Sequence, residues 1–189
     1  MRARSRPARG ADLPVYRTRP LPTAILQGQF FVPQEVLSVT SRALVDAALA
    51  GIHDGGHEGL VFWAGKELGN GAVFLQAIIP VADHSSQRVM ASRTEVGEVA
   101  RRARAQHLGI LCQVHSHPSS DSRHSDGDDE LVLLPFENML SIVAPHFGLR
   151  LRLISDCSVH QFQGGRWVLC STESVERGFT VVPAEMDLR

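Results

Sequence analysis

The sequence predicts one mixed α/β domain in which two amphipathic helices alternate with short strands. The length of 189 residues fits a single domain that buries most of its surface on folding. Apolar residues make up 43% and charged residues 21%, close to the average of globular proteins. Helical and strand-like apolar patterns follow one another without an internal repeat, which indicates a mixed sheet flanked by helices.

The first twenty residues differ in composition from the rest of the chain. They contain six arginines and three prolines against one acid, Asp12, and they lack the apolar stretch of a secretory signal. Because such a segment cannot bury a core, we expect residues 1–20 to form a disordered basic arm. A tether for nucleic acid or an acidic partner is the alternative, although the formal net charge of −1 gives no overall attraction to nucleic acid or anionic lipid.

The elements after the arm alternate between strand and helix. In order, we expect a strand at 29–32, a helix at 34–50, and strands at 59–64 and 71–80. Pro33 suits the start of the helix, where its missing amide would have no partner, and glycines after residue 50 end it. The last two strands are joined by a turn, which favours an antiparallel pair. Glu58 stands immediately before the first strand of this pair.

The second half of the chain contains a strong helix signal followed by several strands. In order, we expect a polar loop at 81–91, a helix from Ser92 to near Gly109, a strand at 110–117, a short helix from Ser125 or Asp126 to about Leu134, and strands at 139–144, 149–155, 159–163 and 167–170. Ser92 and Glu95 form a capping box at the start of the first helix. No period is visible after Ser171, so we expect residues 173–189 to form a C-terminal tail.

Three cysteines, at 112, 157 and 170, restrict the compartment and the type of metal site. They cannot form an even disulfide framework, and their spacing is not that of a cysteine zinc knuckle. We expect them to be reduced, which favours a cytoplasmic protein. The apolar runs are shorter than a bilayer span, so no membrane contact is expected.

Two histidines stand at the C-terminal end of the strand expected at 110–117. Side chains two residues apart in a strand point to the same face, so His115 and His117 can converge on one ion. Asp128, after ten intervening residues, offers an oxygen as the third ligand. Three protein ligands leave a fourth position for water, as in catalytic rather than structural zinc sites. The pattern predicts one catalytic zinc ion per chain.

These residues also carry a resemblance to a known family. The His-x-His-Pro segment at 115–118, followed by the Ser-x-x-Asp segment at 125–128, resembles the JAMM signature of the JAB/MPN+ zinc metallopeptidases. The Glu-Gly-Leu-Val segment at 58–61 resembles the upstream glutamate of that family. The resemblance implies a JAB/MPN domain with a cytidine-deaminase-like layout, here at residues 21–172. It also implies that Glu58 is the general acid/base.

The chemistry of peptide hydrolysis is consistent with these assignments. A zinc ion makes bound water more acidic, and a carboxylate such as Glu58 accepts the proton and passes it to the leaving amine. Ser125 would donate a hydrogen bond to the developing oxyanion, or would serve only as a helix N-cap. Glu67 is the nearest competing acid. His57 and His124 adjoin motif residues, but no spacing assigns them to the site.

The resemblance to standalone prokaryotic JAB proteins implies cleavage after the C-terminal tail of a ubiquitin-like protein or its conjugates. Activating and conjugating enzymes of the same system would then be further partners, and no nucleic acid is expected. The alternatives are a processing peptidase for a small sulfur-carrier protein, a RadC-type DNA-associated protein and a non-catalytic MPN scaffold. Every ligand is present, which disfavours a scaffold, and residues 119–121 lack the glycine usual in RadC-type proteins. The loop at 81–91 either aligns an extended substrate tail or only connects its neighbours.

Overall fold

The computed structural model of the chain describes residues 20–125, 128, 135–149 and 151–183. The basic arm expected at 1–20 lies outside the described residues except for Pro20. The short helix expected from Ser125 or Asp126 to Leu134 also lies outside them, except at Ser125 and Asp128. Across the described ranges, no helix is both long and apolar enough to cross a membrane.

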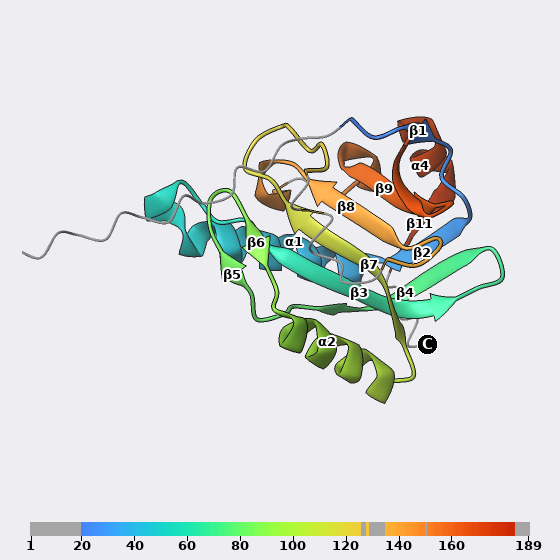
Figure 1. The fold of residues 1–189 in the computed structure, drawn as a ribbon, viewed down its shortest axis with the longest axis horizontal. Helices are drawn as coiled ribbons and strands as arrows, with labels where there is room; N and C mark the ends of the chain where they lie inside the picture. The colour runs from blue at the N-terminus through green and yellow to red at the C-terminus, as the bar shows by residue number, and fades with distance from the viewer. Residues whose placement is uncertain (1–19, 126–127, 129–134, 150, 184–189) are drawn as a thin grey trace, which may run out of the picture.

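A nine-stranded mixed sheet forms the centre of the fold, with the strand order β1-β10-β9-β8-β7-β3-β4-β2-β11 (Figure 1). Its strands are β1 (Thr23–Ala24), β2 (Gln29–Pro33), β3 (Leu60–Glu67), β4 (Gly71–Ile78), β7 (Gly109–Ser116), β8 (Leu140–Ala144), β9 (Ser158–Gln163), β10 (Arg166–Cys170) and β11 (Phe179–Val182). The helices are α1 (Gln34–Ala50), α2 (Arg93–Ala105) and α4 (Thr172–Gly178), with short 3-10 helices η1 (Ile52–Asp54), η2 (His146–Gly148) and η3 (Ile154–Asp156). The predicted fold class, a mixed sheet flanked by helices, is confirmed.

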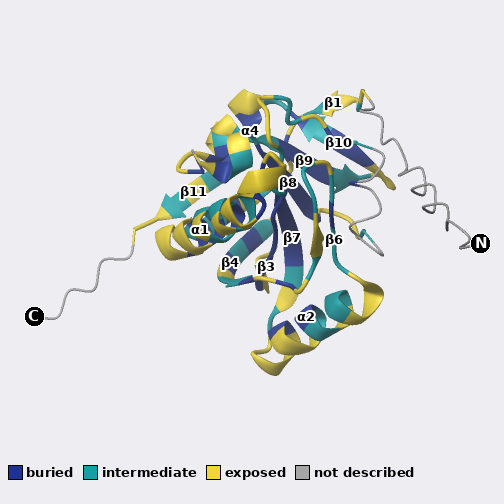
Figure 2. Ribbon diagram, turned by 90° about the vertical axis from the view of Figure 1, so that its left-hand side faces the viewer, coloured by how far each residue is buried: buried dark blue, intermediate teal, exposed yellow. Residues whose placement is uncertain are grey.

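Strand β3 separates two apolar cores because its side chains alternate between the two faces of the sheet. Val61 and Trp63 pack in the core that contains α1, and Leu60 and Phe62 pack in the core that contains α2. The Trp63 Nε1–H donates to Thr40 Oγ1 of α1 at 2.8 Å, so burying this indole leaves no polar atom unpaired. Figure 2 shows α1 and α2 on opposite sides of the buried central strands.

The Ser92 half of the capping box predicted for the second helix is present. Ser92 is the N-cap of α2, and its side chain accepts a hydrogen bond from the Glu95 amide at 3.2 Å. The helix ends at Ala105 rather than near Gly109, because β7 already begins at Gly109. The predicted strands at 29–32, 110–117, 139–144, 159–163 and 167–170 all occur, within one residue at each end.

The strand predicted at 149–155 is wrong. This segment contains η3, and its apolar side chains Leu149 and Leu153 are 64% and 58% exposed. The chain turns sharply just before it, because Phe147 and Gly148 have left-handed φ angles of 58° and 75°. Leu149 and Leu153 therefore face solvent, whereas Leu151 and Ile154 of the same segment are buried in the core without forming a strand.

Two elements after Ser171 had no signal in the sequence. Helix α4 and strand β11 are too short for a visible period. Strand β11 pairs in parallel with β2, and the ring of Phe179 stacks on that of Phe30 with centroids 5.3 Å apart. The segment up to Val182 therefore supplies an edge strand of the central sheet.

The stretch at 81–91, expected to be a loop, contains a small hairpin of β5 (Asp83–His84) and β6 (Val89–Met90). The hairpin is attached to the start of β3. The Glu58 amide donates to the Ser85 carbonyl at 2.9 Å, and Nδ1 of His84 lies 2.7 Å from the Glu58 carbonyl oxygen. The hairpin thus lies directly beside the segment that carries Glu58.

Candidate active site

The site lies where the start of β3 meets the end of β7. These two strands are antiparallel, with Leu60 opposite His115, so residues just before β3 lie beside residues at the end of β7. His117 follows β7 directly, and its amide donates to the Ala144 carbonyl at 2.9 Å, which continues the parallel pairing of β7 with β8. Glu58 and both histidines are therefore held by the most heavily paired strands of the fold.

His115, His117 and Asp128 form a group that could hold a metal ion, with ligand atoms all within 4.8 Å of one another. His115 Nε2 lies 3.0 Å from Asp128 Oδ1, and His117 Nε2 lies 3.9 Å from Asp128 Oδ2. His115 is fully buried, yet neither of its ring nitrogens has a hydrogen-bond partner of good geometry in the described part of the chain. Because unpaired buried polar atoms are costly, this donor set of two imidazoles and one carboxylate fits a divalent metal ion.

The neighbours of His117 and Asp128 prepare both side chains for coordination. His117 Nδ1 lies 2.8 Å from the Asp121 carbonyl oxygen, which can only accept, so Nδ1 carries the proton and Nε2 is left free. The Ser125 amide donates to Asp128 Oδ2 at 2.5 Å. Burial acts to raise the pKa of Asp128, but the close approach of His115 and the Ser125 amide outweigh it and hold the pKa well below its usual range.

Glu58 has the environment of a proton-transfer group. Its side chain is only 7% exposed, and burial raises its pKa to about 7, against the opposing effect of His115 and with a contribution from the negative charge of Asp128. A carboxyl group in this range can both accept and return a proton near neutral pH. A bound divalent cation would lower this pKa and favour the carboxylate, the form that accepts a proton.

One small pocket of about 130 Å³ brings these groups together. It is lined by Glu58, His117, Ser125 and Asp128 from the predicted site and by Gln87, Arg88 and Val89 from the β5–β6 hairpin. His115 lies buried next to them, in contact with Asp128. The structure therefore gathers all five residues that the sequence pattern singled out.

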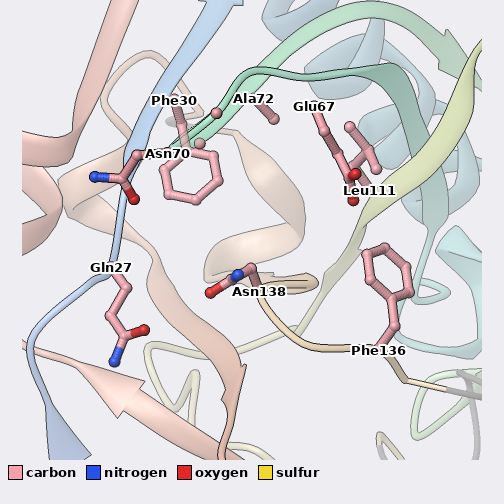
Figure 3. Close-up of a pocket in the computed structure, with 10 residues that line it drawn as sticks. Gln27, Phe30, Glu67, Asn70, Ala72, Leu111, Phe136 and Asn138 are labelled. Atoms are coloured by element: carbon pink, nitrogen blue, oxygen red, sulfur yellow. The ribbon is translucent and has the colours of Figure 1, made fainter.

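The competing acid Glu67 does not share this pocket. It ends β3, seven residues beyond Leu60, which at about 3.3 Å per residue places it some 23 Å from the site end of the strand. There it lines a different pocket together with Leu111 and Phe136, as Figure 3 shows. Glu67 is therefore not placed to act with the histidines.

The two histidines left outside the site also have other surroundings. His57 lies 3.9 Å from the exposed Asp54 carboxylate. His124 is buried, 3.5 Å from Ser141 Oγ, with its ring 4.7 Å from that of His160, and it is close enough to Asp128 to help lower the pKa of that carboxyl group. Neither lines the pocket that contains Glu58.

Sequence reasoning missed two sets of residues near the site. The hairpin residues Gln87, Arg88 and Val89 belong to the stretch at 81–91, for which the family resemblance implied a role in aligning a substrate tail, but no sequence feature singled out these three residues. Ser116, between the two histidines, carried no signal at all, because strand alternation only predicts that it points away from them.

Comparison with known proteins agrees with this geometry. The family described as prokaryotic homologs of the JAB domain matches residues 43–153, more than half of the chain. "Probable metalloprotease y4jG" of Sinorhizobium fredii (strain NBRC 101917 / NGR234) is 30% identical over 107 residues, which cover 54% of this chain. This chain therefore spans 65% of the length of the relative.

Two solved structures match most of this chain, and the first of them is similar in fold. The solution structure of protein DSY2949 from Desulfitobacterium hafniense has a TM-score of 0.60 at 12% identity, covering 84% of this chain and 96% of that one. The JAB1/MPN domain protein AF2198 from Archaeoglobus fulgidus has a TM-score of 0.43 at 13% identity, covering 83% and 98%. The family match covers Leu60 of β3, both histidines and Asp128. The family match over residues 43–153 shows that this chain belongs to the prokaryotic JAB-domain family.

Proposed function

We propose that this chain is a zinc-dependent peptidase that hydrolyses the amide bond after the C-terminal tail of a ubiquitin-like protein. The observation that carries the proposal is the shared pocket, in which a buried acid, Glu58, lies beside the group His115, His117 and Asp128. A metal-ligand set with three protein donors and a separate proton-transfer carboxyl is the arrangement of hydrolytic zinc sites.

Each residue of the pocket has a distinct part in this chemistry. Zinc held by His115, His117 and Asp128 would acidify water and polarise the scissile carbonyl. Glu58 accepts the proton of the attacking water and gives it to the leaving amine, which converts an amide anion into a good leaving group. Ser125, at the wall of the same pocket, donates a hydrogen bond to the oxyanion.

The form of the cleft supports a narrow, extended substrate. A pocket of about 130 Å³ admits little more than a segment of main chain with small side chains. The hairpin that forms one wall consists of β5 and β6 alone, so within the described residues each strand has one neighbour and one edge left for another strand. An extended tail could pair with such an edge through main-chain hydrogen bonds. Arg88 would add a positive charge at this wall.

The name of the relative y4jG supports a metalloprotease activity, and the resemblance to JAB proteins of conjugation systems supports a ubiquitin-like substrate with its activating and conjugating enzymes as partners. A small sulfur-carrier protein would present the same kind of tail. We also propose a cytoplasmic location, because Cys112, Cys157 and Cys170 are all free thiols.

The test begins with elemental analysis of the purified protein, for which we expect about one zinc per chain. Cleavage is then followed on three substrates: a ubiquitin-like protein with a short C-terminal extension, the same protein linked to a lysine side chain, and a sulfur-carrier protein with an extension. Cleavage of the third substrate alone would shift the assignment to carrier processing. Absence of zinc after metal-replete expression would refute the proposed function.

A further inference from the structure

Ser116 lies between the two histidine ligands but faces the opposite side of β7. It is fully buried, and its hydroxyl and its amide both bond to one residue, Gly59. The Ser116 hydroxyl oxygen accepts a hydrogen bond from the Gly59 amide at 3.0 Å, and the Ser116 amide donates to the Gly59 carbonyl at 3.1 Å. The Ser116 side chain thus accepts a hydrogen bond from a main-chain amide just before β3.

Gly59 is the residue directly after Glu58, and its position is tightly enclosed. A Cβ atom added at Gly59 would meet the main chain of α1 at 3.0 Å from Leu44 Cα, so the strand entry is pressed against the helix. On its other side, the Glu58 amide is bonded to the Ser85 carbonyl, and Nδ1 of His84 contacts the Glu58 carbonyl. The main chain that carries the acid is therefore held from two directions.

We propose that Ser116 is a positioning residue for Glu58, an inference that rests on the proposed function of the site. Its hydroxyl accepts the hydrogen bond of the Gly59 amide. Removing the hydroxyl would leave this amide unpaired and would free the main chain next to Glu58 on one side. Because Ser116 stands between His115 and His117, one strand end fixes both the metal ligands and the acid/base. Ser116 thereby contributes to setting the distance between Glu58 and the metal ligands.

Ser174 offers a matched control for this inference. It is also nearly buried, at 4% exposure, and its Oγ accepts a main-chain amide hydrogen bond, from Leu26, at the same 3.0 Å. It belongs to α4, away from the pocket. Ser116→Ala and Ser174→Ala both remove an acceptor of a main-chain amide, one beside Glu58 and one far from it. Ser174→Ala also removes the two hydrogen bonds that Ser174 Oγ makes with Ser171, so it is at least as severe a perturbation of the fold.

The experiment compares kcat, KM, zinc content and thermal stability in the full-length zinc protein. We expect both alanine variants to melt at lowered temperatures, with Ser174→Ala lowered at least as much, and both to keep one zinc. Only Ser116→Ala should lose kcat, by about 10- to 100-fold with KM nearly unchanged, since a small misplacement of a reacting group costs rates of this order. Ser116→Thr, which keeps the hydroxyl, should recover most of kcat. Wild-type kcat in Ser116→Ala, or an equal loss in Ser174→Ala, would overturn the inference.

A second measurement does not depend on activity. Amide hydrogen exchange at Gly59 should become faster in Ser116→Ala and stay slow in Ser174→Ala, and unchanged exchange at Gly59 in Ser116→Ala would also overturn the inference. If the wild type neither holds zinc nor cleaves any substrate, the proposed function fails. The exchange result still decides whether Ser116 holds the strand entry.

Discussion

Replacing Glu58 by glutamine should separate proton transfer from metal binding. Glutamine has nearly the same shape, and the bonds of the Glu58 main chain to Ser85 and His84 do not involve the side chain. The change therefore removes the basic carboxylate and leaves the segment in place. Glu58 lies outside the group of ligand atoms, so we expect the variant to retain one zinc per chain.

The expected loss of kcat in Glu58→Gln depends on whether the pocket contains another acid that could replace Glu58. General acid–base catalysis contributes about 10²–10⁴ in rate, or about 3–5 kcal/mol of transition-state stabilisation. Among the described residues that line the pocket, the only other carboxyl is Asp128, which is committed to the histidines. Because no second acid among these described residues can replace Glu58, we expect a loss in kcat toward the upper end of this range.

The assay follows cleavage of a ubiquitin-like protein with a C-terminal extension, with zinc determined on the same samples. Glu67→Gln serves as the control, because it makes the same chemical change at the far end of β3 and should leave kcat unchanged. Full activity in Glu58→Gln would show that another group moves the proton. Loss of zinc in this variant would show instead that Glu58 is a ligand.

Three further predictions concern the ligands, the oxyanion and the arm. Asp128→Asn should weaken zinc retention by roughly 10–100-fold in chelator competition, because the neutral amide loses its charge attraction to the ion, and unchanged retention would remove Asp128 from the ligand set. Ser125→Ala keeps the main-chain bond to Asp128 and should retain zinc while kcat falls by about 10²–10³, whereas a purely capping serine would change stability alone. Deletion of residues 1–20 should change kcat on a small substrate less than about tenfold, because the composition of this arm cannot bury a core, and a larger loss with intact folding would place the arm in the substrate groove.

The sequence was most informative where function or capping depends on a short local pattern. The Ser92 box fixed the start of α2 to the residue, and His115 and His117 lie two apart on a strand, so their convergence needs no knowledge of the rest of the fold. Asp128 came from its spacing in the motif, although the helix expected around it lies outside the described residues.

The misses share a physical cause. Leu149 and Leu153 are apolar residues on an exposed turn. A sequence pattern cannot show that residues with left-handed φ angles just before this segment change the direction of the chain. The edge strand β11 forms because β2 offers a partner about 150 residues earlier in the chain, a contact that no local window contains. The roles of Ser116 and of the hairpin likewise depend on what lies opposite them in space.

The register between β3 and β7 relates the motif residues, which the sequence shows, to the spatial neighbours, which it does not show. A shift of one residue in a strand pair turns every side chain to the other face, so pairing Leu60 with any residue but His115 would carry Glu58 away from the metal ligands. The register already shifts once along this pair, between Trp63 and Ala64, so the far part of β3 does not fix it at the site. The double hydrogen bond between Ser116 and Gly59 is the last pairing before the site. Ser116, which the sequence did not single out, thus adds a side-chain hydrogen bond to the pairing that brings the two recognisable motifs together.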